Sequence, residues 1–287
     1  MPSEIIQWFP GHMAKTRRMI SENLSLVDVV FELLDARIPY SSQNPEIKRL
    51  TAQKPRITLL SKSSLADKSA TAKWKKYFEE NGRRCIFYDL RTGEGLDKIQ
   101  PLVREICAEK LSRYEEKGMN RPLKAMIVGI PNVGKSSLIN RLAADKKAKV
   151  ENRPGVTVNK QWVKTSIGID LLDMPGVLWP KFEERRVGEN LALTGAIKDD
   201  VMDIETLSCT LCLRLRESYP EQLCSRYKLE RSEIEDLQGF EIVELIGRRR
   251  GFLVSGGEIN FERTANMLID EYRAGTIGRI TLELPEG

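Results

Sequence analysis

A glycine-rich loop at residues 129–137, with the sequence GIPNVGKSS, has the composition of a phosphate-binding site. It fits the pattern of a glycine, four variable positions and then Gly-Lys-Ser. In such a loop, backbone N–H groups and a lysine ammonium surround a polyphosphate, and the hydroxyl that follows the lysine is a ligand of Mg²⁺. We therefore expect Lys135 to contact the terminal phosphates and Ser136 to bind Mg²⁺.

The segments on either side of this loop must position it. Residues 123–128 (LKAMIV) form a short apolar run typical of a strand, and residues 137–144 (SLINRLAA) have the spacing of an amphipathic helix. A strand that leads through a glycine-rich turn into a helix leaves several backbone N–H groups unpaired and directed at one point, where the helix dipole favours negative charge. Because a strand, the loop and a helix follow one another in the expected order, a chance match to the motif is disfavoured. The sequence therefore predicts that the protein binds a nucleoside triphosphate or diphosphate.

Strands and helices alternate through the first part of the chain. Apolar runs predict further strands, and amphipathic stretches predict helices between them. This alternation predicts an α/β fold with a doubly wound, mainly parallel sheet. The expected strands are residues 27–34, 56–60 and 85–88, and the expected helices are residues 14–23, 44–51, 70–81 and 96–110.

Composition limits the class of protein. The chain has 287 residues, of which 41% are apolar and 30% charged, as is typical of a globular protein with one large domain or, more often at this length, two. The net charge of +5 is compatible with an RNA partner but does not require one. No apolar run approaches the roughly 18 residues of a membrane span, and the N-terminus lacks the layout of a signal peptide, so we expect no membrane association.

Cysteines and basic residues each leave an alternative open. The odd number of five cysteines argues against a disulfide framework and favours the reducing cytoplasm. Cys209 and Cys212 have the spacing of a redox or zinc motif, but no histidine or second pair lies nearby, so buried thiols are the favoured interpretation. Basic clusters at residues 15–18, 146–149 and 248–250 either contact nucleic acid or form solvated faces.

Two segments after the phosphate loop have the features of phosphate sensors. Residues 153–157 (RPGVT) form a loop that carries Thr157, and residues 161–172 predict a hairpin of strands that ends in Asp173-Met174-Pro175-Gly176. An Asp at the end of a strand, with a Gly three residues later, suits a sensor of the γ-phosphate. Asp173 would hold Mg²⁺ through a water molecule, and the Gly176 N–H would contact the γ-phosphate.

The order of these motifs differs from that of Ras-like proteins. There the base-binding Asn-Lys-x-Asp loop follows the phosphate loops, whereas here the nearest match, Ser61-Lys62-Ser63-Ser64, precedes the phosphate loop by about 70 residues. The sequence resembles the circularly permuted GTPases, and among them the ribosome biogenesis GTPase A family. The resemblance spans essentially the whole chain and rests on WFPGHM (8–13), DARIP (35–39), PNVGKS (131–136), RPGVT (153–157), DMPGVLWP (173–180) and SGG (255–257).

This resemblance implies a cytoplasmic GTPase that acts late in assembly of the large ribosomal subunit. It implies GTP/GDP, Mg²⁺ and an activating K⁺ as cofactors. Its partners would be the large-subunit precursor and rRNA, without membrane or DNA, and the protein is expected to be a monomer off the ribosome. The resemblance places the following residues at the nucleotide: Ser61, Lys62, Ser63, Ser64, Asp89, Leu90, Gly129, Asn132, Val133, Gly134, Lys135, Ser136, Ser137, Thr157 and Gly176. It implies that Ser136 and Thr157 bind Mg²⁺ and that Asp173 binds Mg²⁺ through a water molecule. It also implies that Asn132 binds K⁺.

His12 is the only histidine in the sequence. Its spacing alone favours a ring without a chemical role. In the family, a hydrophobic residue follows the sensor glycine where Ras-like proteins have a water-orienting Gln, and the histidine of an N-terminal Pro-Gly-His motif is proposed to position the attacking water. Val177 and Leu178 match the hydrophobic replacement and His12 matches the histidine, so the resemblance implies a catalytic role for His12.

The base-binding loop departs from the family pattern. Ser61 replaces the Asn and Ser64 replaces the Asp that accepts two hydrogen bonds from guanine, while Asp89 and Leu90 replace an Asn-Ser pair. Loss of a charge-assisted pair costs roughly 1.5–3 kcal/mol, or about 10- to 150-fold in guanine affinity. Ser61→Asn with Ser64→Asp is therefore expected to tighten GTP binding, mainly through Ser64→Asp, unless Asp67 already contacts the base.

From residue 179 onward the sequence has helical patterns and mixed charge. We expect a GTPase domain at residues 1–178 and a helical domain at 179–287 that resembles the family's RNA-binding domain. Two alternatives stay open, an RNA-binding scaffold with a degenerate nucleotide site and a nucleoside triphosphatase without guanine preference. The expected helices are residues 183–197, 204–216, 220–227, 231–237 and 260–273, with residues 247–251 (GRRRG) in a loop.

Overall fold

The computed structural model describes residues 10–144 and 162–285, and it divides into two compact units. The first unit contains the residues up to Phe182 and those from Glu283, and the second contains Glu183–Leu282. The boundary that we expected after residue 178 therefore falls after Phe182, and the chain returns to the first unit at its C-terminal end. No helix among the described residues is long and apolar enough to cross a membrane.

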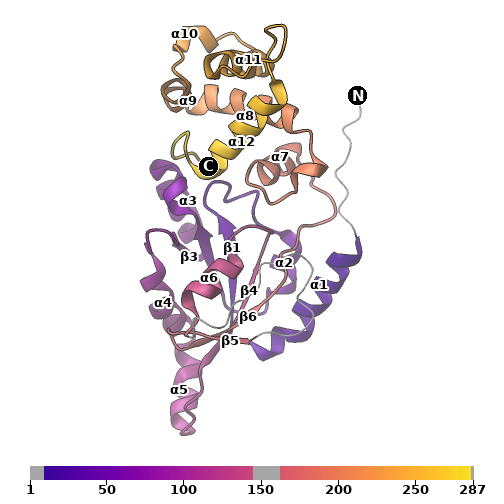
Figure 1. Ribbon diagram of the computed structural model, residues 1–287. Coiled ribbons are helices and arrows are strands. Elements are labelled where there is room, and N and C mark those ends of the chain that lie inside the picture. Colours follow the sequence, from indigo (N-terminus) through magenta and orange to yellow (C-terminus); the bar gives the residue numbers. More distant parts are fainter. Residues whose placement is uncertain (1–9, 145–161, 286–287) are drawn as a thin grey trace. The chain divides into compact units, whose positions relative to one another are not determined.

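The first unit is built on a six-stranded sheet with the strand order β3-β2-β1-β4-β6-β5. Neighbouring strands are parallel except β5, which is antiparallel to β6. The predicted α/β class and mainly parallel sheet are thus confirmed (Figure 1). The strands are β1 (Val29–Asp35), β2 (Arg56–Ser61), β3 (Arg84–Phe87), β4 (Leu123–Gly129), β5 (Trp162–Lys164) and β6 (Ile169–Asp173).

β1 lies in the middle of the sheet, and all seven of its residues are buried. A strand covered on both faces must be apolar along its whole length, which explains its continuous run of valine, phenylalanine and leucine. Two buried carboxylates are the exceptions, Glu32 within the strand and Asp35 at its end. The Glu32 carboxylate is paired with Arg83 (2.7 Å) and Arg56 (3.5 Å). These two arginines allow a charge inside the sheet.

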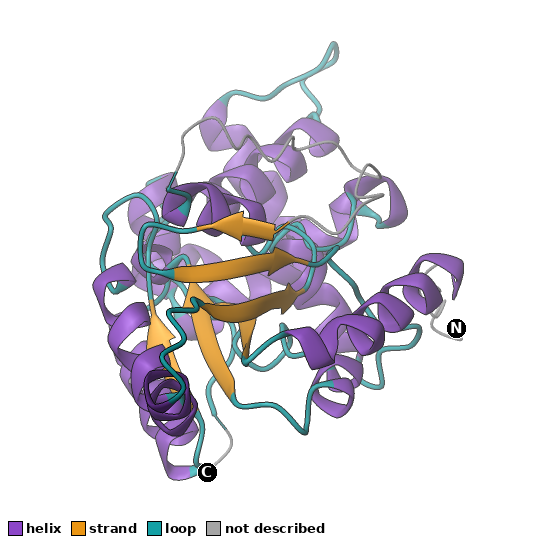
Figure 2. Ribbon diagram, turned by 90° about the horizontal axis from the view of Figure 1, so that it is seen from below, coloured by secondary structure: helices purple, strands orange, loops and turns teal. Residues whose placement is uncertain are grey.

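Helices flank the strands of this sheet (Figure 2). The helix predicted from residue 14 begins at Pro10, because proline is tolerated in the first turn, where no intrahelical N–H is needed. The single helix predicted at residues 96–110 is wrong: a 3₁₀ turn and two helices occur there, and they separate at Cys107, where ψ is 15°. The helices are α1 (Pro10–Asn23), α2 (Pro45–Leu50), α3 (Lys68–Glu80), α4 (Ile99–Ile106), α5 (Ala108–Glu116) and α6 (Lys135–Leu142).

The second unit is a helical bundle arranged around α8 (Ile204–Ser218), which packs against α7, α9, α11 and α12. Leu211, Cys212 and Leu215 of α8 are fully buried in its core. Burial raises the pKa of the Cys212 thiol, and the described residues include no group of three or more His, Cys, Asp or Glu that could hold a metal. Cys212 is therefore a core thiol. The other helices are α7 (Arg185–Leu193), α9 (Pro220–Tyr227), α10 (Arg231–Ile234), α11 (Gly239–Arg250) and α12 (Phe261–Ala274).

The loop predicted at residues 247–251 is wrong for its first four residues, which form the last turn of α11. Gly247 allows this helix to pack closely, because a Cβ there would lie 2.7 Å from Ile259 Cγ2 and from Thr264 Oγ1. The three arginines that follow complement the negative end of the helix dipole. Gly251, with φ of 68°, then ends the helix in the left-handed conformation.

The C-terminal residues are attached to the first unit through the buried Glu283. Its carboxylate accepts hydrogen bonds from the Ser41 N–H (2.8 Å) and the Ser41 hydroxyl (3.0 Å). Its backbone carbonyl accepts a hydrogen bond from Trp74 Nε1 (2.9 Å) on α3. A buried carboxylate that accepts hydrogen bonds is stable only while those donors remain, so this contact should contribute to the stability of the first unit.

We expect Glu283→Ala to destabilise the first unit by roughly 1.5–3 kcal/mol, because hydrogen bonds to a charged group are lost and the Ser41 donors are left buried. The measurement is urea unfolding followed by tryptophan fluorescence, since every tryptophan precedes residue 183. Glu80→Ala, which removes an exposed carboxylate of α3, is the control and should change the midpoint little. Equal midpoints for the two variants would contradict the assignment.

Candidate nucleotide-binding site

The phosphate loop follows β4 as the sequence predicts. β4 ends at Gly129, Gly134 has φ of 98°, and α6 begins at Lys135. At Gly129 a Cβ would lie 2.6 Å from the Leu33 carbonyl oxygen of the neighbouring β1. The loop therefore begins where two central strands approach too closely for a side chain, which explains the first glycine of the motif.

Lys135 is buried and folds back over the loop that precedes it. Its Nζ donates hydrogen bonds to the carbonyls of Ile130 (2.8 Å) and Gly129 (3.2 Å). Burial lowers the pKa of Lys135 to about 8, although the nearby Asp173 acts in the opposite direction. A desolvated ammonium of this kind is stabilised by an anion, and a polyphosphate would supply one.

The predicted sensor segment at residues 173–176 lies against the phosphate loop. Asp173 ends β6, which pairs with β4. A Cβ on Gly176 would lie 2.9 Å from both Lys135 Nζ and Pro131 Cα, and the next residue, Val177, donates its N–H to the Gly129 carbonyl (3.3 Å). Only a glycine allows the segment this close, so the structure brings together two motifs that are distant in sequence.

The predicted base-binding loop, which begins at the end of β2, is attached to the phosphate loop from the other side. Ser61 Oγ lies 2.7 Å from the Val133 carbonyl oxygen and 3.0 Å from that of Leu34. Lys62 Nζ donates to the Asn132 carbonyl (3.1 Å). The loop after β2 is therefore anchored to the phosphate loop although Ser61 replaces the Asn of the family pattern.

Lys62 is itself held by a buried ion pair to which the sequence analysis assigned no role. Lys62 Nζ lies 2.9 Å from Asp35 Oδ2, and Asp35 also pairs with Arg37 Nη2 at 2.8 Å. Burial acts to raise the pKa of Asp35, but Arg37 and Lys62 outweigh it and hold this pKa well below its usual range. The available signal was an aspartate at the end of an apolar strand, with an arginine two residues later.

Ser64 and Asp89 are brought together from two different loops. Ser64 Oγ lies 2.5 Å from Asp89 Oδ2. Asp67, the alternative acceptor for a base, instead caps α3, where its Oδ1 accepts the Ala70 N–H at 2.7 Å. The side chain that we considered first as a substitute for the missing acceptor is therefore committed to a helix terminus.

The other predicted site residues are placed in part. Asn132 and Ser137 are exposed, Ser136 and Leu90 are half-buried, and Ser63 is buried. The backbone of His12 lies in the first turn of α1, while its side chain lies outside the described structure. Thr157 and the basic cluster at residues 146–149 also lie outside the described residues.

Comparison with known proteins agrees with this geometry. A family model described as "50S ribosome-binding GTPase" matches residues 124–235. A ribosome biogenesis GTPase A from Bacillus licheniformis is 47% identical over 98% of this chain and 99% of its own length. The chain belongs to the ribosome biogenesis GTPase A family. The mitochondrial ribosome-associated GTPase 1 of Mus musculus is more distant, with 32% identity over 98% of this chain and 90% of its own.

Solved structures show that the ribosome biogenesis GTPase fold extends over both units. GNP-bound YlqF from T. maritima matches with a TM-score of 0.63 and 27% identity, over 95% of this chain and 99% of that chain. GDP-bound YlqF matches with a TM-score of 0.62 at the same identity. Together with its family, this likeness makes the chain a GTPase, and the phosphate loop described above is its candidate nucleotide site.

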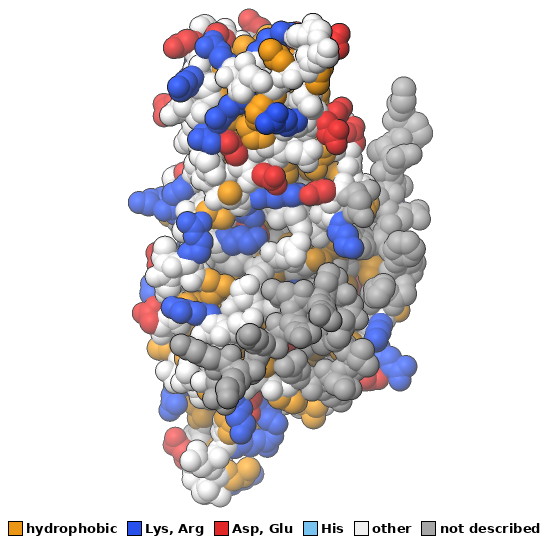
Figure 3. All heavy atoms as spheres, viewed as in Figure 1, with side chains coloured by type: hydrophobic (Ala, Val, Ile, Leu, Met, Phe, Trp, Pro, Cys, Tyr) orange, Lys and Arg blue, Asp and Glu red, His pale blue; other side chains and the backbone are white. Residues whose placement is uncertain are grey.

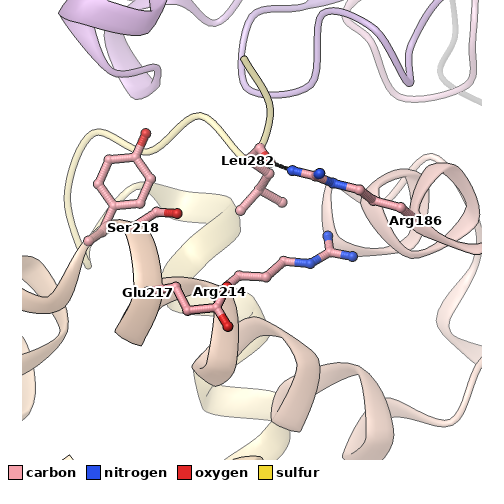
Figure 4. A pocket seen from close by; sticks show the side chains of 6 residues that line it. Arg186, Arg214, Glu217, Ser218 and Leu282 are labelled. Carbon is pink, nitrogen blue, oxygen red and sulfur yellow. Dashed lines mark hydrogen bonds between the residues drawn. The ribbon is translucent and has the colours of Figure 1, made fainter. Parts of the chain in front are cut away.

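A cavity in the helical unit of this GTPase is a separate feature (Figure 4). It has a volume of about 230 Å³ and is lined by mostly polar residues, among them Arg186 and Arg214, together with Leu282. Arg186 Nη2 donates to the Leu282 carbonyl (2.7 Å), and Arg214 is paired with Glu189 and Asn190. Both guanidinium groups are thus used in internal contacts, and we assign no GTPase chemistry to this cavity.

Nucleotide affinity should fall as the pH rises through the pKa of Lys135. Bound phosphates favour the charged lysine, and below about pH 8 the free protein already carries that charge, whereas above it binding must take up a proton. We expect GDP to bind about fourfold more weakly at pH 8.5 than at pH 7. Titration of a fluorescent GDP at both pH values measures this effect.

Lys135→Arg is the matched control, because a guanidinium stays charged throughout this pH range. Whatever its absolute affinity, the arginine variant should show a smaller pH dependence. If the wild type and the arginine variant lose affinity equally, Lys135 is not the group that titrates.

Proposed function

We propose that this GTPase acts late in assembly of the large ribosomal subunit, where it binds rRNA in the precursor particle. The observation that carries the proposal is the likeness to ribosome biogenesis GTPase A over nearly the whole chain. The sensor segment at residues 173–176 is followed within ten residues by the helical unit, which begins at Glu183. Loss of the γ-phosphate would therefore act on a segment that leads directly into the proposed RNA-binding unit.

The proposed cofactor of hydrolysis is Mg²⁺, and the residues present suit it. Mg²⁺ prefers hard oxygen ligands and commonly combines one or two carboxylates with phosphate oxygens. Burial raises the pKa of Asp173, with Lys135 opposing it, so a cation nearby would favour the ionised carboxylate. We assign Ser136 as a direct ligand, Asp173 as a ligand through water and Thr157 as a further ligand. The ion would neutralise charge on the phosphates.

We assign Asn132 to an activating K⁺ ion. Asn132 has φ of 55°, so its backbone adopts the left-handed conformation next to Val133 and Gly134. Its carbonyl is held by Lys62 while its side chain is exposed. A monovalent cation beside the phosphates would supply the positive charge that an arginine supplies in other GTPases.

GTP hydrolysis joins a water oxygen to the γ-phosphorus and breaks the bond from that phosphorus to the β–γ bridging oxygen. In this chain the residues that follow the sensor glycine are the buried Val177 and Leu178, whose side chains cannot orient a water molecule. We assign that role to His12. An imidazole with a pKa near neutrality can hydrogen-bond the water and hold it in line with the scissile bond.

His12→Ala should therefore lower GTP turnover by roughly 100-fold and leave GTP affinity nearly unchanged, because a water-positioning group acts mainly in the transition state. The measurement is single-turnover hydrolysis in K⁺ buffer in the presence of large-subunit particles. His12→Gln retains a side chain that can hydrogen-bond water and should recover part of the rate. Hydrolysis by the alanine variant at the wild-type rate would remove the assignment.

The proposed RNA contact would be electrostatic. On the face drawn in Figure 3, lysine and arginine side chains are interspersed with acidic ones over the helical unit. At the end of α11, Arg248 and Arg249 are both exposed, but Arg249 is paired with Glu233 (2.6 Å) and Arg250 lies 3.5 Å from Glu271, whereas Arg248 forms no ion pair with any described residue. Among these three arginines, Arg248 is therefore the one whose charge is best placed for a phosphate group.

Binding to large-subunit particles should weaken by more than about tenfold between 50 and 200 mM salt, because phosphate contacts release counterions. Arg248→Ala should reduce the slope of log affinity against log salt by about one. Arg249→Ala is the control that removes a paired arginine and should change the slope less. An affinity independent of salt would indicate a protein partner, and binding to small-subunit particles alone would contradict the proposed function.

A further inference from the structure

The contact between Ser64 and Asp89 concerns the one position where this chain lacks the family's base-binding carboxylate. Ser64 occupies that position, in the loop after β2, and Asp89 lies in the loop after β3. Ser64 Oγ is 2.5 Å from Asp89 Oδ2, and the Ser64 nitrogen is 3.4 Å from the same oxygen. The missing negative charge is therefore present one hydrogen bond away, on a different loop.

Both loops lie where the base of a nucleotide at the phosphate loop would be expected. β2 and β3 are the second and third strands from β4 in the sheet. Neighbouring strands are about 4.8 Å apart, so the ends of β2 and β3 are roughly 10–15 Å from the phosphate loop, which is the distance a nucleoside spans. Ligands of open parallel sheets bind along these carboxyl ends. Ser61 and Lys62 anchor the first loop to the phosphate loop.

The two carboxylate oxygens of Asp89 have separate contacts. Oδ1 accepts the N–H groups of Arg91 (2.8 Å) and Thr92 (3.1 Å) and so holds the turn of its own loop. Oδ2 faces Ser64 and is not needed for that turn. Burial acts to raise the pKa of Asp89, but the hydrogen bonds from Ser64 and from the backbone N–H groups outweigh it and lower this pKa, so the group is ionised at neutral pH.

Guanine presents two adjacent donors, the ring N1–H and the exocyclic N2–H, whereas adenine has an acceptor at N1. We propose that Asp89 supplies the negative charge that recognises guanine and that Ser64 holds it in place, so that the carboxylate of the family pattern has moved from the loop after β2 to the loop after β3. The Ser64 hydroxyl donates a hydrogen bond to Asp89. The lone pairs of the Ser64 oxygen are then available to accept from the donors of the base. This proposal rests on guanine-nucleotide binding at the phosphate loop.

The proposal reverses the effect expected for Ser64→Asp from the family pattern alone. A second carboxylate at position 64 would lie against Asp89, and two carboxylates in contact cannot both be ionised without a large penalty. Ser64→Asp should therefore fail to tighten GDP. Combined with Asp89→Asn it should succeed, because the introduced amide can donate to the introduced carboxylate, while its oxygen still accepts the turn's two N–H groups.

The test is a double-mutant cycle of wild type, Ser64→Asp, Asp89→Asn and the combined variant. Each protein is titrated with GDP, ADP and inosine diphosphate, whose base lacks the exocyclic amino group. Asp89→Asn should weaken GDP by about 10- to 150-fold, leave ADP unchanged and remove the preference for GDP over inosine diphosphate. The combined variant should recover GDP affinity and that preference. Asp67→Asn, a nearby carboxylate that caps α3, is the matched control and should leave the ratios unchanged.

Each other outcome overturns the proposal. If Asp89→Asn leaves GDP affinity unchanged, Asp89 only holds its turn. The same follows if the variant melts like the wild type but loses affinity equally for all three nucleotides. Tighter GDP binding by Ser64→Asp alone would mean that position 64 still faces the base without help from Asp89. If the wild type binds none of the three nucleotides, the GTPase function fails together with this proposal. Lys135→Ala is the reference for a protein that has lost nucleotide binding.

Discussion

The carbonyl groups of the phosphate loop are the feature on which the rest of the nucleotide site depends. Lys135 donates to two of them, while Ser61 at the end of β2 and Lys62 directly after it bond two others. Because side-chain donors bond these carbonyls, the loop can direct its N–H groups at the phosphate oxygens of a nucleotide. The site is therefore shaped by donors from segments about 70 residues apart, and a serine at position 61 suffices because one hydroxyl reaches the required carbonyl.

Two buried charged groups near this loop differ in how their charge is stabilised. Asp35 is paired with Arg37 and Lys62, so its pKa is low and its charge is satisfied within the protein. Lys135 is buried, its Nζ donates to two loop carbonyls, and burial lowers its pKa although Asp173 acts in the opposite direction. The first arrangement fixes the loop after β2, and the second leaves a cation that a polyphosphate would stabilise.

The features predicted well from the sequence are those set by short segments. The phosphate loop is bounded by a strand and a helix that can each be recognised within ten residues, and the parallel sheet follows from uninterrupted apolar runs. The hydrogen bond between Ser64 and Asp89 joins positions 25 apart in the sequence and leaves no local pattern. Each of these two departures from the family pattern, taken alone, therefore appeared to be the loss of a contact to the base. In the same way, Gly247 suggested a loop, because its packing partners Ile259 and Thr264 lie in a different segment.

The permuted order has a further structural consequence at the loop after β1. Asn44 Nδ2 on this loop donates to the Val177 carbonyl (3.0 Å), shortly before the chain enters the helical unit. Ser41, three positions earlier, binds the Glu283 carboxylate where the chain returns. Within the first unit, the residues shortly before and just after the helical unit are thus hydrogen-bonded to one short segment, residues 35–44. Because Asp35 also forms an ion pair with Lys62, the same segment is linked to the loop after β2.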